Sequence, residues 1–476
     1  MAFPTSDRIA SQSGLPVGSL RRAGLSRRRA GLSLRQAGLA AVCLVVAAPA
    51  AAQWPRFLNT GFDGRATEEV RIDWSAAPRF RWGLAVGEGY GLGAVSGGRY
   101  YAFDSHVDGD RGRRERLRAV SMETGRVEWS VDRPLIYRDL YGYEPGPRSA
   151  PTVVGDRIVT LGVAGELCCR SLSDGSLVWG VDTSGEYGVV QNFFGVGGSP
   201  LVLDDRVIVM VGGSPEADRR LPPGRIERAS PDGSLLVAFG LQDGRELWRA
   251  GQDLASYSSP RPIELEGQTF VLIFARDQLV LVDPDQGQVR WAFPHRADLV
   301  ESVNAIVPVV DDDLVFISEC YQVGGALLRV TPDDYQVVWQ DPPFDRRSQA
   351  MRSHWATPNL IGGFLYGCSG RNSPDSDFRC VDFRSGEVTW VDPQRTRSSA
   401  TAVGDVLVQH EERGKLRVLR ADPRALDVIA EWDLSRPEGQ RPALAYPCWS
   451  APIVVGDRML VRGDTQVLCL ELPTAP

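Results

Sequence analysis

Eight tryptophans recur along this 476-residue chain, each at the end of a similar short sequence pattern. Successive members are 42 to 69 residues apart, an interval that is typical of one four-stranded blade of a β-propeller. Such a repeat constrains the fold strongly, because one unit alone has nothing against which to bury its apolar face. The eight residues are Trp82, Trp129, Trp179, Trp248, Trp291, Trp339, Trp390 and Trp432.

Most of these tryptophans end a predicted β-hairpin, in which an apolar strand leads into an Asp/Gly-rich turn and a second strand follows. Six segments have this form: 117–129, 167–179, 236–248, 279–291, 327–339 and 378–390. A further predicted strand pair with its own tight turn lies upstream of the hairpins: 149–161, 198–210, 258–273, 308–317, 357–367 and 451–461. Pair and hairpin together predict four antiparallel strands per unit.

The two ends of the chain predict how the array closes. Residues 451–472 supply three strands and no closing tryptophan, whereas Trp82 in segment 79–86 has no three strands before it. We therefore expect the N-terminal strand to complete the C-terminal blade, because closure removes the exposed edges of an open array. The prediction is an all-β, eight-bladed β-propeller over residues 79–473, with a seven-bladed ring as the alternative.

The tryptophans themselves are predicted to be structural, since a large ring repeated in every blade buries area against the neighbouring blade. Two segments interrupt the regular pattern, residues 104–116 and residues 214–234, and the second accounts for the 69-residue interval. Both are rich in charge, so we expect solvated loops in both places.

The N-terminus has the features of a secretory signal over residues 1–52. Basic residues precede an apolar stretch, Ala37 to Ala48, and small residues lead to a predicted cleavage site near Ala52. An uncleaved anchor and a lipoprotein attached at Cys43 are the alternatives. The cleaved protein is expected to be periplasmic or secreted, without a transmembrane segment, and residues 53–78 form an extension expected to pack on the outside of the ring.

Composition excludes one class of partner. The formal net charge of the whole chain is −7, although residues 1–52 alone carry a net charge of +6. The rest of the chain is therefore strongly acidic. Nonspecific nucleic-acid binding needs clustered positive charge, so we expect no nucleic-acid partner. A monomeric exported protein is the expectation.

Seven cysteines follow residue 52, and none forms a Cys-x-x-Cys motif of a zinc ribbon or haem attachment site. Cys168 and Cys169 are adjacent, but the repeat alignment puts both in a strand, where successive side chains point to opposite faces. Cys169, Cys380 and Cys469 share one repeat position. We interpret that position as a small apolar packing site rather than a redox site.

The turn pattern Asp-x-x-(Asp/Thr/Ser)-Gly-x-x-x-Trp resembles the PQQ-like (pyrroloquinoline quinone) repeat and extends over residues 79–473. Three branches share that repeat: quinoprotein alcohol dehydrogenases, the lipoprotein propeller of the outer-membrane barrel-assembly machinery, and uncharacterised secreted bacterial proteins. The phrases GEGY (87–90), PRSAPTV (147–153) and CWSAP (448–452) look most like the third branch. The resemblance to the dehydrogenases implies an axial site for the quinone and calcium, with a carboxylate as base.

Residues just before each innermost strand are expected to surround the mouth of the central channel. Arginine, aromatic and amide side chains there suit a planar anionic ligand or a peptide strand. Calcium bound by Glu88, Glu301 and Asn304 is a weaker hypothesis, because no ligand spacing supports it. The candidate ligand-binding residues are Glu88, Tyr90, Arg148, Tyr257, Asn304, His354, Trp355, Arg397 and Trp449.

The sequence thus favours a noncatalytic exported β-propeller, a protein-interaction or scaffolding module of the cell envelope with a protein or peptide partner and no cofactor. The alternative is a PQQ-dependent oxidoreductase with calcium, or a descendant that retains an axial ligand site. A hydrolase or lyase that uses the axial pocket is a third interpretation. No catalytic residue is assigned, since the chain has no nucleophile elbow, P-loop or dinucleotide fingerprint.

Overall fold

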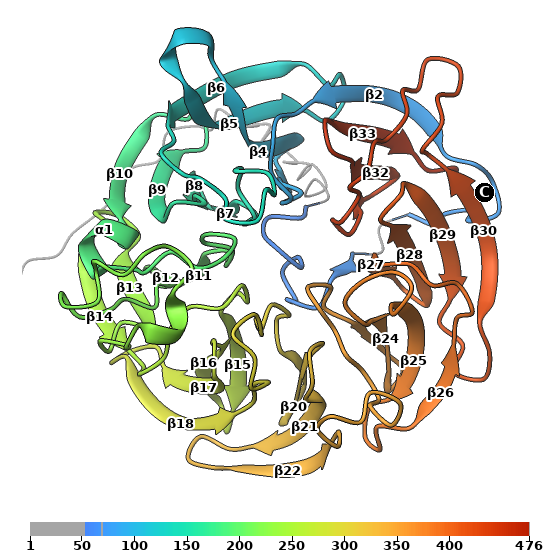
Figure 1. Cartoon of the computed structure of the whole chain (residues 1–476). Helices are drawn as coiled ribbons and strands as arrows, with labels where there is room; N and C mark the ends of the chain where they lie inside the picture. The colour runs from blue at the N-terminus through green and yellow to red at the C-terminus, as the bar shows by residue number, and fades with distance from the viewer. Residues whose placement is uncertain (1–52, 68–69, 476) are drawn as a thin grey trace, which may run out of the picture. The chain divides into compact units, whose positions relative to one another are not determined.

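The structure is a computed structural model that describes residues 53–67 and 70–475. The predicted signal, residues 1–52, lies outside the described residues. Eight antiparallel sheets of four blade strands each surround a central axis (Figure 1), which confirms the predicted eight-bladed propeller. Within the described part, no helix has the length and apolar character that a membrane span needs.

Blades 1 to 4 follow one another along the chain, each built from the innermost strand outward. Their strands are β3 (Ala94–Ser96), β4 (Arg99–Val107), β5 (Arg113–Ser121) and β6 (Val127–Pro134); β7 (Thr152–Val154), β8 (Arg157–Leu161), β9 (Glu166–Ser171) and β10 (Leu177–Asp182); β11 (Leu201–Leu203), β12 (Arg206–Met210), β13 (Leu236–Gly240) and β14 (Glu246–Ala250); β15 (Arg261–Leu265), β16 (Gln268–Phe274), β17 (Gln278–Asp283) and β18 (Gln288–Pro294).

Blades 5 to 7 repeat this order, and blade 8 joins the two ends of the chain. Their strands are β19 (Val309–Asp311), β20 (Leu314–Glu319), β21 (Gly324–Val330) and β22 (Tyr335–Gln340); β23 (Asn359–Ile361), β24 (Phe364–Ser369), β25 (Asp377–Asp382) and β26 (Val388–Val391); β27 (Ser398–Val403), β28 (Val406–Glu411), β29 (Lys415–Arg420) and β30 (Asp427–Asp433); β31 (Ile453–Val455), β32 (Arg458–Arg462), β33 (Gln466–Glu471) and β2 (Arg79–Ala85). Strand β2 pairs with β33, which is the predicted closure.

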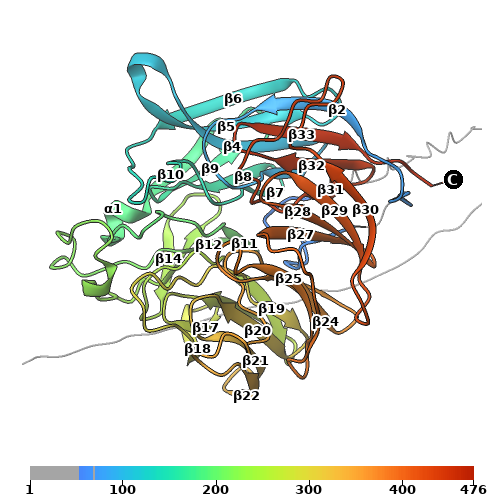
Figure 2. The same ribbon diagram turned by 45° about the vertical axis from the view of Figure 1, so that its right-hand side comes forward.

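The connections divide between two faces of the ring because successive strands in a blade are antiparallel. The connections between blades, and those between the second and third strands of a blade, lie on one face, called here the loop face. The tight turns lie on the opposite face, called here the turn face. Figure 2 shows α1 (Thr183–Tyr187) and the connections near it projecting from the blades at the left.

Six of the repeated tryptophans reach the next blade with the indole N–H. Each donates a hydrogen bond of 2.8 or 2.9 Å to a backbone carbonyl at or near the end of that blade's third strand. The six are Trp82, Trp179, Trp248, Trp291, Trp339 and Trp390. A repeated contact of this kind fixes the spacing of adjacent blades.

Trp129 and Trp432 depart from this arrangement. Trp129 lies opposite Ala119 in the regular register, but its indole nitrogen has no hydrogen-bond partner among the described residues. Trp432 lies two residues beyond the regular position, which Ala430 occupies opposite Val418. The blade that follows it, blade 8, takes its outer strand β2 from the N-terminal part of the chain, so no tight turn joins β33 to that strand.

Residues 104–116 form strands and not the expected loop. They lengthen β4 and β5, which meet at a single 3-10 turn, η1 (Gly109–Arg111). The buried Asp104 carboxylate explains why charge did not prevent a strand here, since it accepts hydrogen bonds from Arg116 and Arg118 on β5. Residues 214–234 do lie in a long connection, between β12 and β13, which contains η2 (Ile226–Arg228).

The start of the extension lies across the axis and not on the outside of the ring. Trp54 is buried and exchanges two backbone hydrogen bonds with Val95 of β3, while β1 (Arg65–Ala66) pairs in parallel with β27. Figure 1 shows this blue segment crossing the centre of the ring. Burial of large apolar side chains in the channel drives this placement. Only the later part, near Ile72, bridges to the C-terminal residues beside β33.

The seven described cysteines are buried and unpaired in disulfides. Cys169, Cys380 and Cys469 each lie directly opposite the tryptophan or its equivalent on the outer strand. The predicted packing role therefore agrees with their common place in the blades.

Candidate functional site

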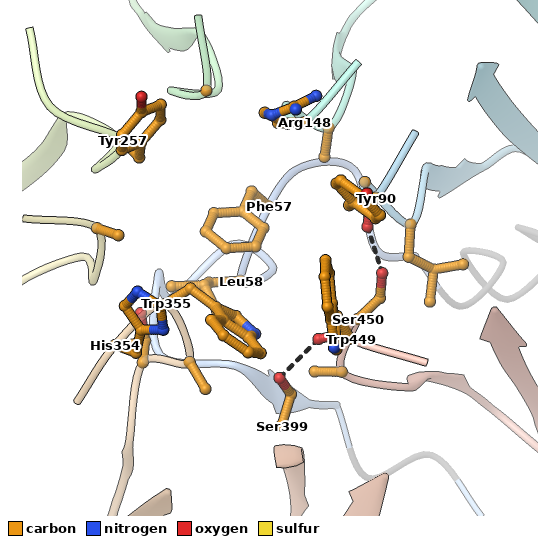
Figure 3. Close-up of a pocket in the computed structure, with 18 of the residues that line it drawn as sticks. Phe57, Leu58, Tyr90, Arg148, Tyr257, His354, Trp355, Ser399, Trp449 and Ser450 are labelled. Carbon is orange, nitrogen blue, oxygen red and sulfur yellow. Dashed lines mark hydrogen bonds between the residues drawn. The ribbon is translucent and has the colours of Figure 1, made fainter. Parts of the chain in front are cut away.

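A cavity with a volume of about 350 Å³ lies on the propeller axis. Its walls are the connections that enter the innermost strands, and its floor includes Trp54, Phe57 and Leu58 of the extension (Figure 3). We call this cavity the axial pocket. Its other end faces the loop face, where Tyr143 and Arg371 contribute to the rim.

Seven of the nine predicted residues line the axial pocket. They share a place just before an innermost strand, which brings side chains from different blades to one end of the channel. The seven are Tyr90, Arg148, Tyr257, His354, Trp355, Arg397 and Trp449.

Glu88 and Asn304 do not line the pocket. Glu88 forms an ion pair with Arg113 and bridges to Ser105 on β4. The Asn304 side chain is buried and donates hydrogen bonds to three backbone carbonyls, the shortest 2.9 Å to Ala275. Both residues hold loops in place, and with Glu301 exposed, the three do not form a calcium site.

Arg397 is held rigidly in the pocket wall. Its guanidinium carbon lies 5.0 Å from the ring centre of Trp355 and 5.1 Å from that of Trp449. Its Nε donates to the Glu412 carboxylate at 2.7 Å, and its Nη2 donates to the Tyr446 hydroxyl at 3.1 Å. Stacking and hydrogen bonding together fix the guanidinium plane.

Arg148 occupies a similar environment elsewhere in the pocket wall. Its guanidinium carbon lies 5.3 Å from the Tyr90 ring centre, and its Nη2 donates to the Asp139 carboxylate at 3.0 Å. Burial raises the pKa of Tyr90 to about 12, so this phenol stays neutral. The wall therefore offers an arginine paired with a carboxylate that lies outside the pocket lining.

His354 carries no charge at neutral pH. Burial, together with the positive Arg371 and Arg397, lowers the pKa of its imidazole to about 3. Its Nδ1 has no hydrogen-bond partner among the described residues, and its Nε2 lies 3.5 Å from the Tyr321 hydroxyl. A neutral imidazole beside two arginines offers a hydrogen bond without adding to the local charge.

Several lining residues were absent from the sequence prediction. Phe57 and Leu58 come from the extension, while Tyr143, Tyr321 and Arg371 come from parts of the connections that lie further from the innermost strands. Arg371 could have been predicted from the sequence, because it follows the second strand of its blade. The connection after a second strand lies on the loop face, as the connections between blades do.

The lining is cationic and aromatic. It contains Arg148, Arg371 and Arg397 and no Asp or Glu side chain among the described residues. The indole nitrogens of Trp355 and Trp449 are buried without a hydrogen-bond partner there, and the two ring centres lie 5.3 Å apart. The arginines of the lining can therefore attract an anion.

The donor set does not fit the quinone with calcium. The arginines suit an anionic group, but calcium takes carboxylate and carbonyl oxygens, and a proton-abstracting base for an alcohol needs a carboxylate or an equivalent group. The described lining offers no carboxylate for either task. His354 is neutral but lies between a tryptophan and two arginines, not beside a metal ligand set.

A possible metal cluster lies away from the axis. The potential ligand atoms of His106, Asp108 and Asp132 lie within 4.8 Å of one another on the β4–β5–β6 sheet. Asp108 pairs with Arg111, and Asp132 pairs with Arg114 at 2.7 Å. A structural zinc site has four ligands, whereas this cluster has three, and two of them are carboxylates already paired with arginine.

Comparisons with known proteins agree with the fold. The profile of the family described as "Outer membrane protein assembly factor BamB" matches residues 113–390. No curated protein matches the chain. The structure of BamB from Moraxella catarrhalis is 13% identical and has a TM-score of 0.54, with 83% of this chain and 98% of that chain covered.

Two quinoprotein structures are also similar. Quinohemoprotein alcohol dehydrogenase from Comamonas testosteroni is 12% identical with a TM-score of 0.62, covering 89% of this chain and 81% of that chain. A europium-containing methanol dehydrogenase is also 12% identical with a TM-score of 0.62, covering 87% and 90%. Identities this low show a common fold alone. With the family profile spanning more than half of its residues, the chain is a PQQ-like repeat β-propeller and belongs to the family described as outer membrane protein assembly factor BamB.

Proposed function

We propose that this chain is an exported, noncatalytic interaction module of the cell envelope that binds a partner protein on its loop face. The observation that carries the proposal is a set of aromatic side chains exposed on the loop face beside the mouth of the axial pocket. Tyr141 is 57% exposed, Tyr446 48% and Tyr143 41%. Soluble proteins seldom leave large apolar side chains grouped in this way unless the surface binds something.

The exposed aromatic rings continue into the pocket. Tyr141 lies 5.6 Å from Phe193 and 5.8 Å from Phe194, and Tyr143 lies 5.2 Å from Phe194 and 6.0 Å from Trp449, all between ring centres. This band of five rings is called here the aromatic band. Aromatic side chains of this kind supply much of the binding energy of protein interfaces.

An envelope location is supported by the sequence and by the family. Residues 1–52 have the basic, apolar and small-residue regions of a secretory signal. The family profile that matches the chain is described as an outer membrane protein assembly factor. Purification from an envelope fraction followed by N-terminal sequencing should give Gln53 as the first residue.

The enzymatic alternative has less support. A dehydrogenase of the quinoprotein kind requires oxygen ligands for calcium and a base beside the quinone, and the described pocket lining lacks a carboxylate for these roles. Binding of a partner requires no such group. The apolar loop face therefore supports an interaction module better than an oxidoreductase.

Site-specific photo-crosslinking in the cells that make the protein tests this proposal. A photoreactive residue at position 136, on the loop face, should give a discrete crosslinked product, because the native side chain there is almost fully exposed. The matched control is position 384, where an arginine lies in an exposed turn of the turn face. Equal crosslinking at both positions, or none at position 136, would contradict the proposal.

A further inference from the structure

The axial pocket is closed at one end by the chain itself. The carbonyl of Pro55 accepts a hydrogen bond of 2.7 Å from Val153, the Gly64 carbonyl accepts one of 3.0 Å from Ala402, and Trp54 bridges to Val95. The floor is thus tied to the innermost strands of blades 1, 2 and 7. A partner segment therefore cannot pass through the ring and can enter the pocket only from the loop face.

Two arginines converge on the inner wall. Arg371 and Arg397 both act on the same imidazole, His354, through their positive charge. The Arg397 guanidinium is fixed between Trp355 and Trp449, whereas the Arg371 guanidinium lies over the Tyr321 ring at 4.9 Å and has no carboxylate partner among the described residues. Part of the positive charge in this wall is therefore available to an incoming anion.

The charged side chains of the wall are also hydrogen-bond donors. Arg148, Arg371 and Arg397 all line the pocket. Oxygen atoms with negative charge are the acceptors that suit arginines, so a ligand with a carboxylate fits this wall.

The remaining lining is apolar and aromatic. Phe57, Tyr143, Phe194 and Tyr257 surround the space beside the donors. A ligand that fills the pocket must therefore carry a carboxylate next to a sizeable apolar group. An internal Asp or Glu offers a carboxylate without an adjacent apolar group. The last residue of a polypeptide offers both groups when its side chain is apolar.

We propose that the axial pocket binds the C-terminal carboxylate of a partner polypeptide, with its last, apolar side chain among the aromatic rings. The proposal rests on the proposed function, in that the ligand belongs to a protein that docks on the loop face. Capture of a terminal carboxylate by preplaced donors is an established mode of peptide recognition. The aromatic band leads from the outer loops to this pocket and would guide the chain end toward it.

Fluorescence anisotropy with a labelled peptide tests the proposal. The probe is fluorescein-Gly-Ser-Gly-Ser-Phe with a free C-terminus, and the reference is the same peptide with an amidated C-terminus. We expect the free acid to bind at least about tenfold more tightly than the amide, since amidation removes the charge that the arginines recognise. A free acid that binds no better than the amide would overturn the proposal.

Two variants locate the binding in the pocket. Arg371→Ala should weaken the free acid about three- to tenfold and leave the amide unchanged, because it removes one charge without breaking an ion pair. Trp355→Phe should also weaken the free acid, because a smaller ring stacks less well on the Arg397 guanidinium. Arg245→Ala, an exposed arginine in a turn on the other face, is the control and should change neither affinity.

Other outcomes distinguish the chain-end proposal from the proposed docking function of the loop face. If fluorescein-Gly-Ser-Gly-Ser-Gly with a free C-terminus binds as tightly as the probe, the pocket does not recognise an apolar last side chain, and the chain-end proposal is overturned. An amidated peptide ending in Asp that binds as tightly as the free acid would also overturn it. Crosslinking at position 136 that persists while the free acid fails to bind would leave the docking face intact and reject the pocket proposal alone.

Discussion

Two buried histidines link single residues to the stability of the fold. Burial lowers the pKa of His295 and of His410 to about 4. Each ring has one backbone contact, Nε2 of His295 with the Gly324 carbonyl and Nδ1 of His410 with the Ser450 carbonyl. An unfolded histidine has a pKa of about 6.5. The unfolded chain therefore binds protons first, and the histidines' contribution to stability is lost as the pH falls from 6.5 to 4.

Replacement of His410 by Gln tests this dependence on pH. Gln retains a donor for the Ser450 carbonyl but does not titrate. Between pH 7 and pH 5 the free energy of unfolding of the wild type should fall by up to about 2 kcal/mol relative to that of His410→Gln. Urea denaturation at both pH values measures the difference in the free energy of unfolding between the two proteins. The contributions of the other titrating groups cancel in this difference. A difference that stays constant with pH would show that folding does not lower the pKa of His410.

At the scale of the blade, a turn glycine packs against the tryptophan of the preceding blade. Gly125, Gly175, Gly244, Gly287 and Gly386 all have a positive φ, and a Cβ at any of them would lie 3.0 Å or less from an indole. The repeated Asp/Gly turn thus has two roles. It reverses the chain, and it leaves room for the ring that fixes the neighbouring blade.

Gly244→Ala and Gly267→Ala separate these two roles. Both glycines have φ near +70°, but a Cβ at Gly244 would lie 2.6 Å from Trp179, whereas one at Gly267 meets nothing within 4 Å. Gly267→Ala should cost about 1–2 kcal/mol for the left-handed backbone alone. Gly244→Ala should cost about 1–3 kcal/mol more because the indole must move. Urea denaturation compares them, and equal losses would mean that the tryptophan contact tolerates the methyl group.

The sequence did not predict the elements whose residue pattern disagrees with their surroundings in the fold. The blades could be predicted because alternating apolar residues and turn glycines recur at a fixed interval. Residues 104–116 look like a solvated loop because of their charge, yet Asp104 is neutralised across the strand pair by Arg116 and Arg118. The segment from Trp54 to Ala66 has no partner in the repeat, so nothing in its pattern indicates that the channel covers it.

The candidate site was predictable in part for a related reason. A common offset before each innermost strand finds the correct end of the channel, and seven of nine residues reach the pocket. A residue's position before an innermost strand does not fix the direction of its side chain. Glu88 therefore pairs with Arg113, and Asn304 donates to backbone carbonyls, instead of lining the pocket. Phe57 and Leu58 could not be placed, because their location depends on the whole ring being closed around them.

At the scale of the whole molecule, the two faces of the ring differ in chemistry. The turn face carries short Asp/Gly turns, whereas the loop face carries the long connections, the exposed rings of Tyr141 and Tyr143 and the open end of a cationic, aromatic pocket. A closed ring of blades gives such a surface a rigid base. The asymmetry is the central reason for assigning the molecule a docking role.

Hydrogen–deuterium exchange of the complex tests that role most directly. The complex would contain this chain and the protein that crosslinks at position 136. The account predicts slower amide exchange in the loop-face connections 135–147, 341–358 and 434–452 on binding, with no change in the turns near Gly97 and Gly386 on the turn face. Protection centred on the turn face, with the loop-face connections unchanged, would contradict it.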